Sequence, residues 1–140
     1  MGKLADVNHR KVREIPKHMP FVPLTLELLK SDAWRGMSIN CRRLIDFLLI
    51  EHMNHAGLEN GDLIATYKQL EKFGVNRISK AIKEAEDRGL IIIEHGSRKS
   101  LNESYPNRFQ LTFLKYKDKN SNNVSSYYAP TNQWKRYNKK

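Results

Sequence analysis

Two pairs of helix start and stop signals near the middle of the chain limit its fold more than any other feature. Thr66 and Gln69 have the spacing of a capping box, in which each side chain accepts a hydrogen bond from the backbone N–H of the other residue. Gly74 then provides a helix stop, and Gly89 provides a second one after a further helical segment at 76–88. The pattern predicts two short helices joined by a tight turn.

The second helix, 76–88, is expected to begin at Asn76, because asparagine is a favourable N-cap. Its apolar residues recur at intervals of three and four, which places them on one face of a helix. These residues are Ile78, Ala81, Ile82 and Ala85. We expect that face to turn toward the core and the charged residues between them to point outward.

Apolar periodicity predicts further elements on both sides of this helix pair. A long helix is expected from Ser38, as N-cap, to about His55. The alternation of Phe109, Leu111 and Phe113 is typical of a strand with one buried face. In chain order the predicted elements are a short helix near 24–32, the long helix, a short strand at 63–65, the two helices above, and strands at 90–93 and 109–113.

This order of elements is that of a winged helix-turn-helix domain, a mainly helical α+β fold with a three-helix core and a β-hairpin wing. We assign 21–114 to this domain, with the loop of the wing at 96–107. A basic N-terminal arm at 1–20 and a basic, aromatic-containing tail at 115–140 are expected to be flexible. Domains of this kind that bind DNA place the last helix of the core in the major groove.

The net charge of +10 is concentrated at the two ends of the 140-residue chain. Residues 1–20 hold five Lys or Arg against two acidic residues, and 115–140 hold seven against one. The middle, 21–114, holds thirteen against twelve. Basic arms around a near-neutral domain are typical of nucleic-acid-binding proteins, although solubilising tails would have the same composition.

Charge within the helix 76–88 runs against the helix dipole. Arg77, Lys80 and Lys83 occupy the first half, and acidic residues gather at 84–87. The dipole favours the opposite order, typically by about 0.3–1 kcal/mol for each well-placed charge. Phosphate groups of DNA would compensate, because the first half of a recognition helix enters the major groove between two backbones.

An alternative explanation of these charges needs no DNA. Lys80 with Glu84, and Lys83 with Asp87, have the i,i+4 spacing of surface ion pairs. Each pair would stabilise the helix by roughly 0.2–0.5 kcal/mol, in the less favourable of the two orientations.

Side-chain chemistry suggests a role for each residue at the start of this helix. Arg77 could pair bidentately with guanine, and Asn76 could bind adenine if its cap role leaves it free. Ser79 and Lys80 are expected to point outward beside them, and Lys83 to contact phosphate.

The wing offers three further candidates for DNA contact. Arg98 and Lys99 lie near its predicted tip, suited to the minor groove or the backbone, although a basic loop tip is often only solvated. Arg108, at the base of the second strand, could have a binding or a structural role.

Residues 74–82 (GVNRISKAI) resemble the turn and the start of the recognition helix in bacterial helix-turn-helix proteins. More narrowly, 31–114 is similar to a group of short winged-helix proteins of proteobacterial genomes, often from phage- or plasmid-derived regions. The strings that carry this similarity are SDAW at 31–34, EHMNH at 51–55, ENG at 59–61, PNRF at 106–109 and LT at 111–112. The resemblance implies a DNA-binding fold and no particular biological role. Leu70 departs from the pattern, because a small residue is usual inside the first helix of a helix-turn-helix.

The C-terminal tail interleaves aromatic residues with cations. The aromatic residues are Tyr127, Tyr128, Trp134 and Tyr137, and the cations include Lys135, Arg136, Lys139 and Lys140. Such a mixture can stack on bases and follow a nucleic-acid backbone. We favour packing against the core or a partner subunit for Tyr127, Tyr128 and Trp134, and electrostatic attraction for the cations.

Other classes of function find little support in the sequence. His52 and His55 could share a metal ion, but two histidines without a cysteine partner make an incomplete site, and histidine near a helix C-terminus suits the dipole. Cys41, the only cysteine, lies among apolar residues, where a thiol is usually inert. No Gly-rich phosphate loop, nucleophile elbow or zinc-finger spacing occurs. We expect no enzymatic activity, cofactor, metal or small-molecule ligand, and no membrane span.

Taken together, these patterns predict a sequence-specific double-stranded DNA-binding protein that serves as a transcriptional regulator in the cytoplasm, at the nucleoid. The helix 76–88 would enter the major groove, and the wing would contact the backbone or the minor groove. One alternative is an accessory factor in the replication or excision of a mobile element. Another is a winged-helix module that binds other proteins. A homodimer is an option, since many such domains bind paired half-sites.

Overall fold

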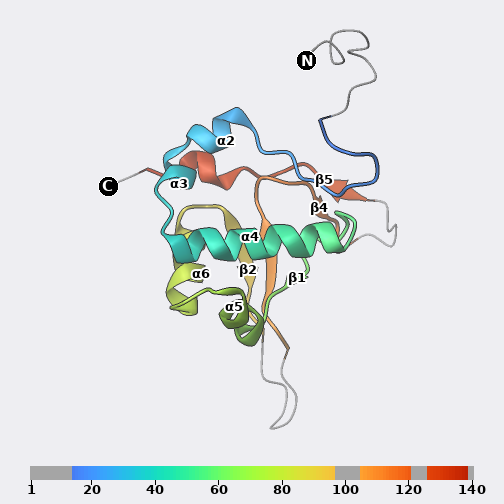
Figure 1. The fold of residues 1–140 in the computed structure, drawn as a ribbon. Coiled ribbons are helices and arrows are strands. Elements are labelled where there is room, and N and C mark those ends of the chain that lie inside the picture. The colour runs from blue at the N-terminus through green and yellow to red at the C-terminus, as the bar shows by residue number, and fades with distance from the viewer. Residues whose placement is uncertain (1–13, 97–104, 121–125, 139–140) are drawn as a thin grey trace, which may run out of the picture.

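The computed structural model describes residues 14–96, 105–120 and 126–138, and within these the chain forms a small α+β fold (Figure 1). Its helices are α2 (Leu26–Lys30), α3 (Asp32–Arg35), α4 (Ile39–Asn54), α5 (Tyr67–Phe73) and α6 (Ile78–Asp87). Its strands are β1 (Leu63–Ile64), β2 (Ile91–Glu94), β3 (Arg108–Leu111), β4 (Tyr116–Lys117) and β5 (Tyr127–Tyr128), and a 3₁₀ turn, η2, spans Gln133–Arg136.

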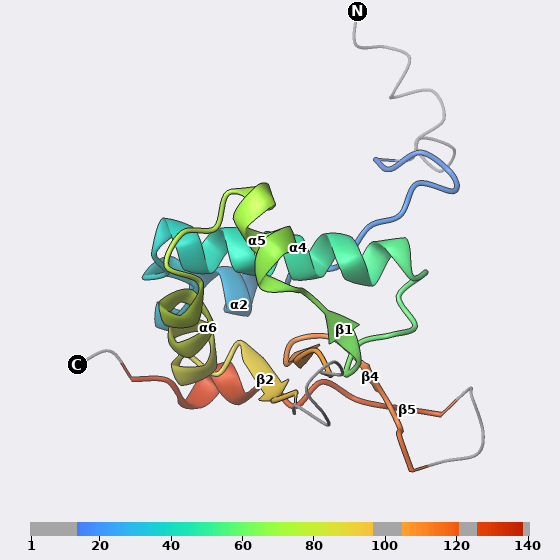
Figure 2. The same ribbon diagram turned by 90° about the horizontal axis from the view of Figure 1, so that it is seen from below.

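Helix α4 is the centre of the fold and begins where the sequence predicted. Ser38 is its N-cap, and the Ser38 hydroxyl accepts from the Cys41 N–H at 3.2 Å. Both ribbon views show α4 between α2 on one side and α5 on the other (Figures 1 and 2). Its buried residues therefore contact the core on more than one face: Cys41, Leu44, Ile45, Leu48, Leu49 and His52.

The predicted start and stop of α5 are confirmed. Thr66 and Gln69 form both hydrogen bonds of the capping box, and Gly74 follows the helix with a φ of 103°. A positive φ suits glycine, which has no Cβ to collide with the backbone.

The predicted N-cap of the next helix is wrong. Helix α6 begins at Ile78, and its N-cap is Arg77, which has a left-handed backbone (φ 49°, ψ 57°) and makes no side-chain cap hydrogen bond. The chain turns sharply at Arg77, so Asn76 lies outside the helix. The backbone N–H of Asn76 donates instead to Oδ1 of Asn40 on α4, at 2.9 Å.

Strands β1, β3 and β2 form an antiparallel sheet in that order, which confirms the predicted pairing of the last two strands across the loop. Phe109 lies opposite Leu63 on one side and Ile93 on the other. Strand β3 ends at Leu111, short of the predicted Phe113, although Phe113 is buried as its alternation required.

The N-terminal part differs from the single short helix predicted near 24–32. Ser31 divides it into α2 and α3, because its N–H donates to the Leu28 carbonyl while its hydroxyl accepts from the Trp34 N–H at 3.2 Å. Residues 14–20 are exposed and contain no helix or strand, and 1–13 lie outside the described residues.

The prediction that 115–140 is a flexible tail is wrong for the described residues of that segment. β4 pairs with β5, and Trp134 is only 4% exposed and belongs to the core cluster. Packing of Trp134 is thus confirmed, while Tyr128 is about half exposed and lies 5.2 Å from the Tyr116 ring. The buried Asn60 side chain fixes the entry to this segment by donating to the carbonyls of Leu111, Leu114 and Lys115 and accepting from the Leu111 N–H.

Gly89 allows η2 to approach the end of α6, and this contact can be tested. Its φ is +73°, and a Cβ at this position would lie 2.8 Å from backbone atoms of Gln133 and Trp134. Gly89→Ala should therefore lower the free energy of unfolding by about 2–5 kcal/mol, combining left-handed strain with overpacking. Urea unfolding would measure it.

Gly57→Ala is the matched control, because Gly57 has a similar φ of +71° but a Cβ there would approach no atom closer than 3.5 Å. It should cost only about 1–2 kcal/mol. Equal losses in the two variants would show that η2 does not dock on Gly89 in solution.

Candidate functional site

Two side chains of α4 hold the turn between α5 and α6. Arg43 donates through Nη1 to the Gly74 carbonyl at 2.9 Å, and Asn40 accepts from the Asn76 N–H at the same distance. Neither residue was singled out in the sequence, because both read as polar positions on the outer side of a helix. The turn that precedes α6 is therefore fixed by contacts from a distant segment.

The five residues predicted to contact DNA here extend from the turn before α6 to the middle of that helix. Asn76, Arg77, Ser79, Lys80 and Lys83 are all exposed. On the inward side of α6, Ala81, Ile82 and Ala85 are buried, and Ile78 is half-buried. Exposure is a condition for contact with a large ligand, and all five residues meet it.

The cations of this face differ in their partners. Lys83 forms an ion pair with Asp87 at 2.7 Å, one of the two i,i+4 pairs that the alternative explanation required. Arg77 and Lys80 form no ion pair within the described part of the chain. Helix α5 adds two exposed lysines that also form no ion pair with a described residue, Lys68 and Lys72, and no sequence pattern marked either of them.

Ser79 is engaged with a neighbour that sequence reasoning missed. Its Oγ lies 2.9 Å from the hydroxyl of Tyr67, at the start of α5. The two exposed hydroxyls therefore form one hydrogen-bonded pair between the helices.

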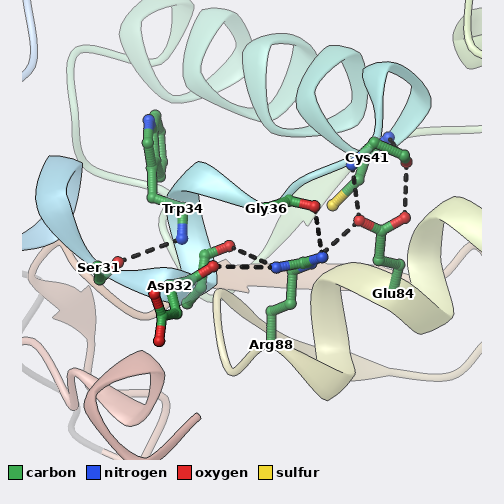
Figure 3. Close-up of polar contacts among 9 residues, drawn as sticks. Ser31, Asp32, Trp34, Gly36, Cys41, Glu84 and Arg88 are labelled. Atoms are coloured by element: carbon green, nitrogen blue, oxygen red, sulfur yellow. Dashed lines mark hydrogen bonds and ion pairs between the residues drawn. The ribbon is translucent and has the colours of Figure 1, made fainter. Parts of the chain in front are cut away.

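Glu84 has a structural role that explains an acidic residue in the second half of α6 (Figure 3). Its carboxylate accepts from the Ser38 N–H at 2.8 Å, from the Ser38 hydroxyl at 2.6 Å and from Arg88 Nε at 3.0 Å. A carboxylate at the start of α4 also interacts favourably with the dipole of that helix. The Lys80–Glu84 pair of the alternative explanation does not form.

The hydrogen bonds to Glu84 control its protonation. Burial acts to raise the pKa of this carboxyl, but the hydrogen bonds from Ser38 and Arg88 and the positive charge of Arg88 outweigh it. The net effect lowers the pKa of Glu84 below its ordinary value, so the ion pair with Arg88 persists at neutral pH.

Arg88 connects the end of α6 to α3 (Figure 3). Its guanidinium donates to the carbonyls of Asp32, Ala33 and Gly36, and the ring of Tyr137 lies 5.1 Å away. The side chain is only 13% exposed, which fits an arginine whose donors are taken up by the protein. Glu84 and Arg88 thus anchor the C-terminal half of α6 and leave its N-terminal half outward.

The remaining predicted cations are in different positions. Arg98 and Lys99 lie outside the described residues. Arg108 Nη1 lies 3.5 Å from Oδ1 of Asp62, which also pairs with Lys117 and Lys119. Arg108 therefore belongs to a charged cluster on the sheet side and, unlike Arg77 and Lys80, has an acidic partner.

Neither the cysteine nor the two histidines of α4 and its C-cap form a reactive or metal-binding site within the described residues. Burial, followed by the nearby Glu84 carboxylate, raises the pKa of the Cys41 thiol to about 12, so it is protonated at neutral pH. Burial lowers the pKa of His52, and His55 lies 3.5 Å from Glu51. No three His, Cys, Asp or Glu side chains within 14–96, 105–120 and 126–138 are arranged to hold a metal ion. None of the helices in these ranges has the length and apolarity needed to cross a membrane.

Comparison of the chain with protein-family models, curated proteins and solved structures found no match. The similarity of 74–82 to bacterial recognition helices therefore stays a prediction.

The contact between Glu84 and Ser38 predicts a pH dependence of stability. Because the folded-state pKa of Glu84 is lowered, its contribution should be present above the ordinary glutamate pKa of about 4.3 and be lost as pH falls through the folded value. Glu84→Gln should lower the free energy of unfolding by about 1.5–3 kcal/mol at pH 7, the range for hydrogen bonds to a charged group. The difference from wild type should shrink toward pH 3, as followed by urea unfolding.

Glu86→Gln removes the same charge from an exposed position of the same helix and serves as control. If Glu86→Gln lowers the free energy of unfolding at pH 7 as much as Glu84→Gln does, the anchoring role of Glu84 is contradicted.

Proposed function

We propose that the chain is a winged helix-turn-helix protein that binds double-stranded DNA sequence-specifically, as a transcriptional regulator, with α6 in the major groove. One observation carries the proposal. Helix α5, the turn after it and the start of α6 hold four exposed cations without an acidic partner among the described residues: Lys68, Lys72, Arg77 and Lys80. Among the other described cations, Arg88, Arg108, Lys117 and Lys119 pair with acidic residues of the fold, whereas Lys30, Arg35 and Arg136, which lie elsewhere in the chain, also form no ion pair.

The order of elements supports the proposed fold. Helix α4, strand β1, helices α5 and α6, and strands β2 and β3 follow one another in the order of a winged helix, and β3 lies between β1 and β2. Arg98 and Lys99 lie between β2 and β3 in the sequence, where such a domain has its wing.

The backbone of Arg77 supports a binding role for its side chain. A left-handed conformation costs a residue other than glycine roughly 1–2 kcal/mol, and glycine or asparagine would be the economical choice. Such conformations cluster at functional sites, where the side chain has a use that offsets the strain. Asparagine, which tolerates this backbone better, precedes it at Asn76, but the left-handed position itself is occupied by Arg77.

The unfavourable order of charges along α6 supports DNA binding through two of its cations, Arg77 and Lys80. Glu84 and Lys83 have partners within the protein, so they need no DNA to account for them. Arg77 and Lys80 stand at the positive end of α6 with no such partner among the described residues. A polyanionic duplex would supply the missing compensation.

Arg77→Asn separates binding from stability. Asparagine tolerates the left-handed backbone, so the free energy of unfolding should stay the same or rise by up to about 1 kcal/mol. Affinity for a selected DNA site should fall by about 1–3 kcal/mol, with loss of discrimination at one base position. Fluorescence anisotropy on specific and mutated duplexes would measure this, beside urea unfolding. If wild-type protein at micromolar concentration and low salt shifts no duplex, the proposal fails.

Lys80→Gln tests the electrostatic part of the interface. If Lys80 contacts one phosphate, the slope of log affinity against log salt concentration should become shallower by about 0.9, with a similar loss on every sequence. Lys30→Gln is the matched control, because Lys30 is also an exposed lysine but lies on α2, across α4 from α5 (Figure 1). Identical slopes for the two variants would exclude Lys80 from the interface.

A further inference from the structure

An open depression of about 560 Å³ lies where α5 meets the start of α6. It is lined by residues from both helices and from the turn between them, which Figure 2 shows joining α5 to α6. The polar members of the lining are Tyr67, Glu71, Asn76, Arg77, Ser79 and Lys80. Four of these, Asn76, Arg77, Ser79 and Lys80, belong to the predicted DNA-contacting set, whereas Tyr67 and Glu71 do not.

One acidic residue, Glu71, and two basic residues, Arg77 and Lys80, line this depression without forming an ion pair. Glu71 and Arg77 are both exposed, and neither forms an ion pair with any residue that the structure describes. An ion pair needs nitrogen and oxygen atoms within about 4 Å of each other, so the charged groups of Glu71 and Arg77 lie farther apart than this. Their separation leaves a carboxylate acceptor and a guanidinium donor both available to a ligand.

The presence of Glu71 makes a phosphate group a poor ligand here. A carboxylate repels phosphate, and a site built only for the backbone would carry donors alone. The Tyr67 and Ser79 hydroxyls, 2.9 Å apart, add a neutral patch in which one O–H is used between them. A lining that mixes acceptor, donor and neutral groups is complementary to the edge of a base pair.

Among the base pairs, G·C fits the two charges. In the major groove guanine presents two acceptors, O6 and N7, which an arginine binds bidentately, and cytosine presents the N4 amino donor, which a glutamate accepts. Adenine offers one acceptor and one donor, and thymine offers an acceptor and a methyl group, so an A·T pair cannot satisfy both charges in this way. We propose that this depression binds a G·C base pair, with Arg77 on the guanine and Glu71 on the cytosine amino group, a role that rests on the proposed function.

Selection of bound duplexes from a random pool, followed by affinity measurements on single-pair variants, tests this assignment. Wild-type protein should select an invariant G·C pair at one position of its site. Glu71→Gln should relax discrimination at that position at least about fivefold, the low end of what one specific contact contributes, and leave the other positions unchanged. Glu71 is exposed, and glutamine has nearly the same shape, so thermal unfolding should match wild type.

Glu86→Gln is the control, because it removes an equal charge from an exposed position of α6 that does not line the depression. Electrostatics alone predicts that both variants bind every duplex somewhat more tightly, without change in base preference. That result for Glu71→Gln would overturn the G·C assignment and leave DNA binding intact. Failure of the wild-type protein to enrich any duplex would instead overturn the proposed function, and the assignment with it.

Discussion

The arrangement of α6 depends on the hydrogen bonds that Glu84 and Arg88 make with segments about fifty residues earlier in the chain. Glu84 accepts from the N-cap residue of α4, and Arg88 donates to three carbonyls around α3. The two side chains also bind each other at 3.0 Å in a largely buried position. Removing one partner would leave a desolvated charge, which costs far more than the loss of a surface ion pair. The pair therefore fixes the end of α6 more firmly than apolar contacts alone would.

A second set of contacts fixes the other end of the same helix. Arg43 and Asn40 hold the turn before α6, so α4 and its N-cap residue contribute contacts near both ends of α6. With α6 held in this way, its exposed residues have fixed positions relative to those of α5. That geometry allows Glu71 of α5 and Arg77 of the turn to line one depression. A binding surface whose side chains stand on anchored helices loses little order when a ligand binds.

The C-terminal segment contributes to the same core that supports α6. Trp134 is buried, η2 approaches the backbone of Gly89, and Thr112 donates to the Gly89 carbonyl. Tyr137 lies over the Arg88 guanidinium. The composition of this segment, rich in Lys, Asn and Ser, predicted a flexible tail. A few well-placed residues, above all Trp134 and the buried Asn60 that holds the turn after β3, decided otherwise.

The sequence by itself determined the helices and strands whose signals lie within a few residues of one another. The capping box at Thr66, the left-handed glycine at Gly74 and the alternation of Phe109 and Leu111 depend on the local backbone, so they could be read directly. The outward position of Arg77 and Lys80 followed from the same periodicity. Only the tertiary structure decided the start of α6 at Ile78, the partners of Glu84 and Arg108, the packing of Trp134 and the place of Glu71 and Arg77 around one depression. These features join residues from different elements, in most cases tens of residues apart in the chain, and the periodicity of a single element carries no information on which distant side chain it will meet.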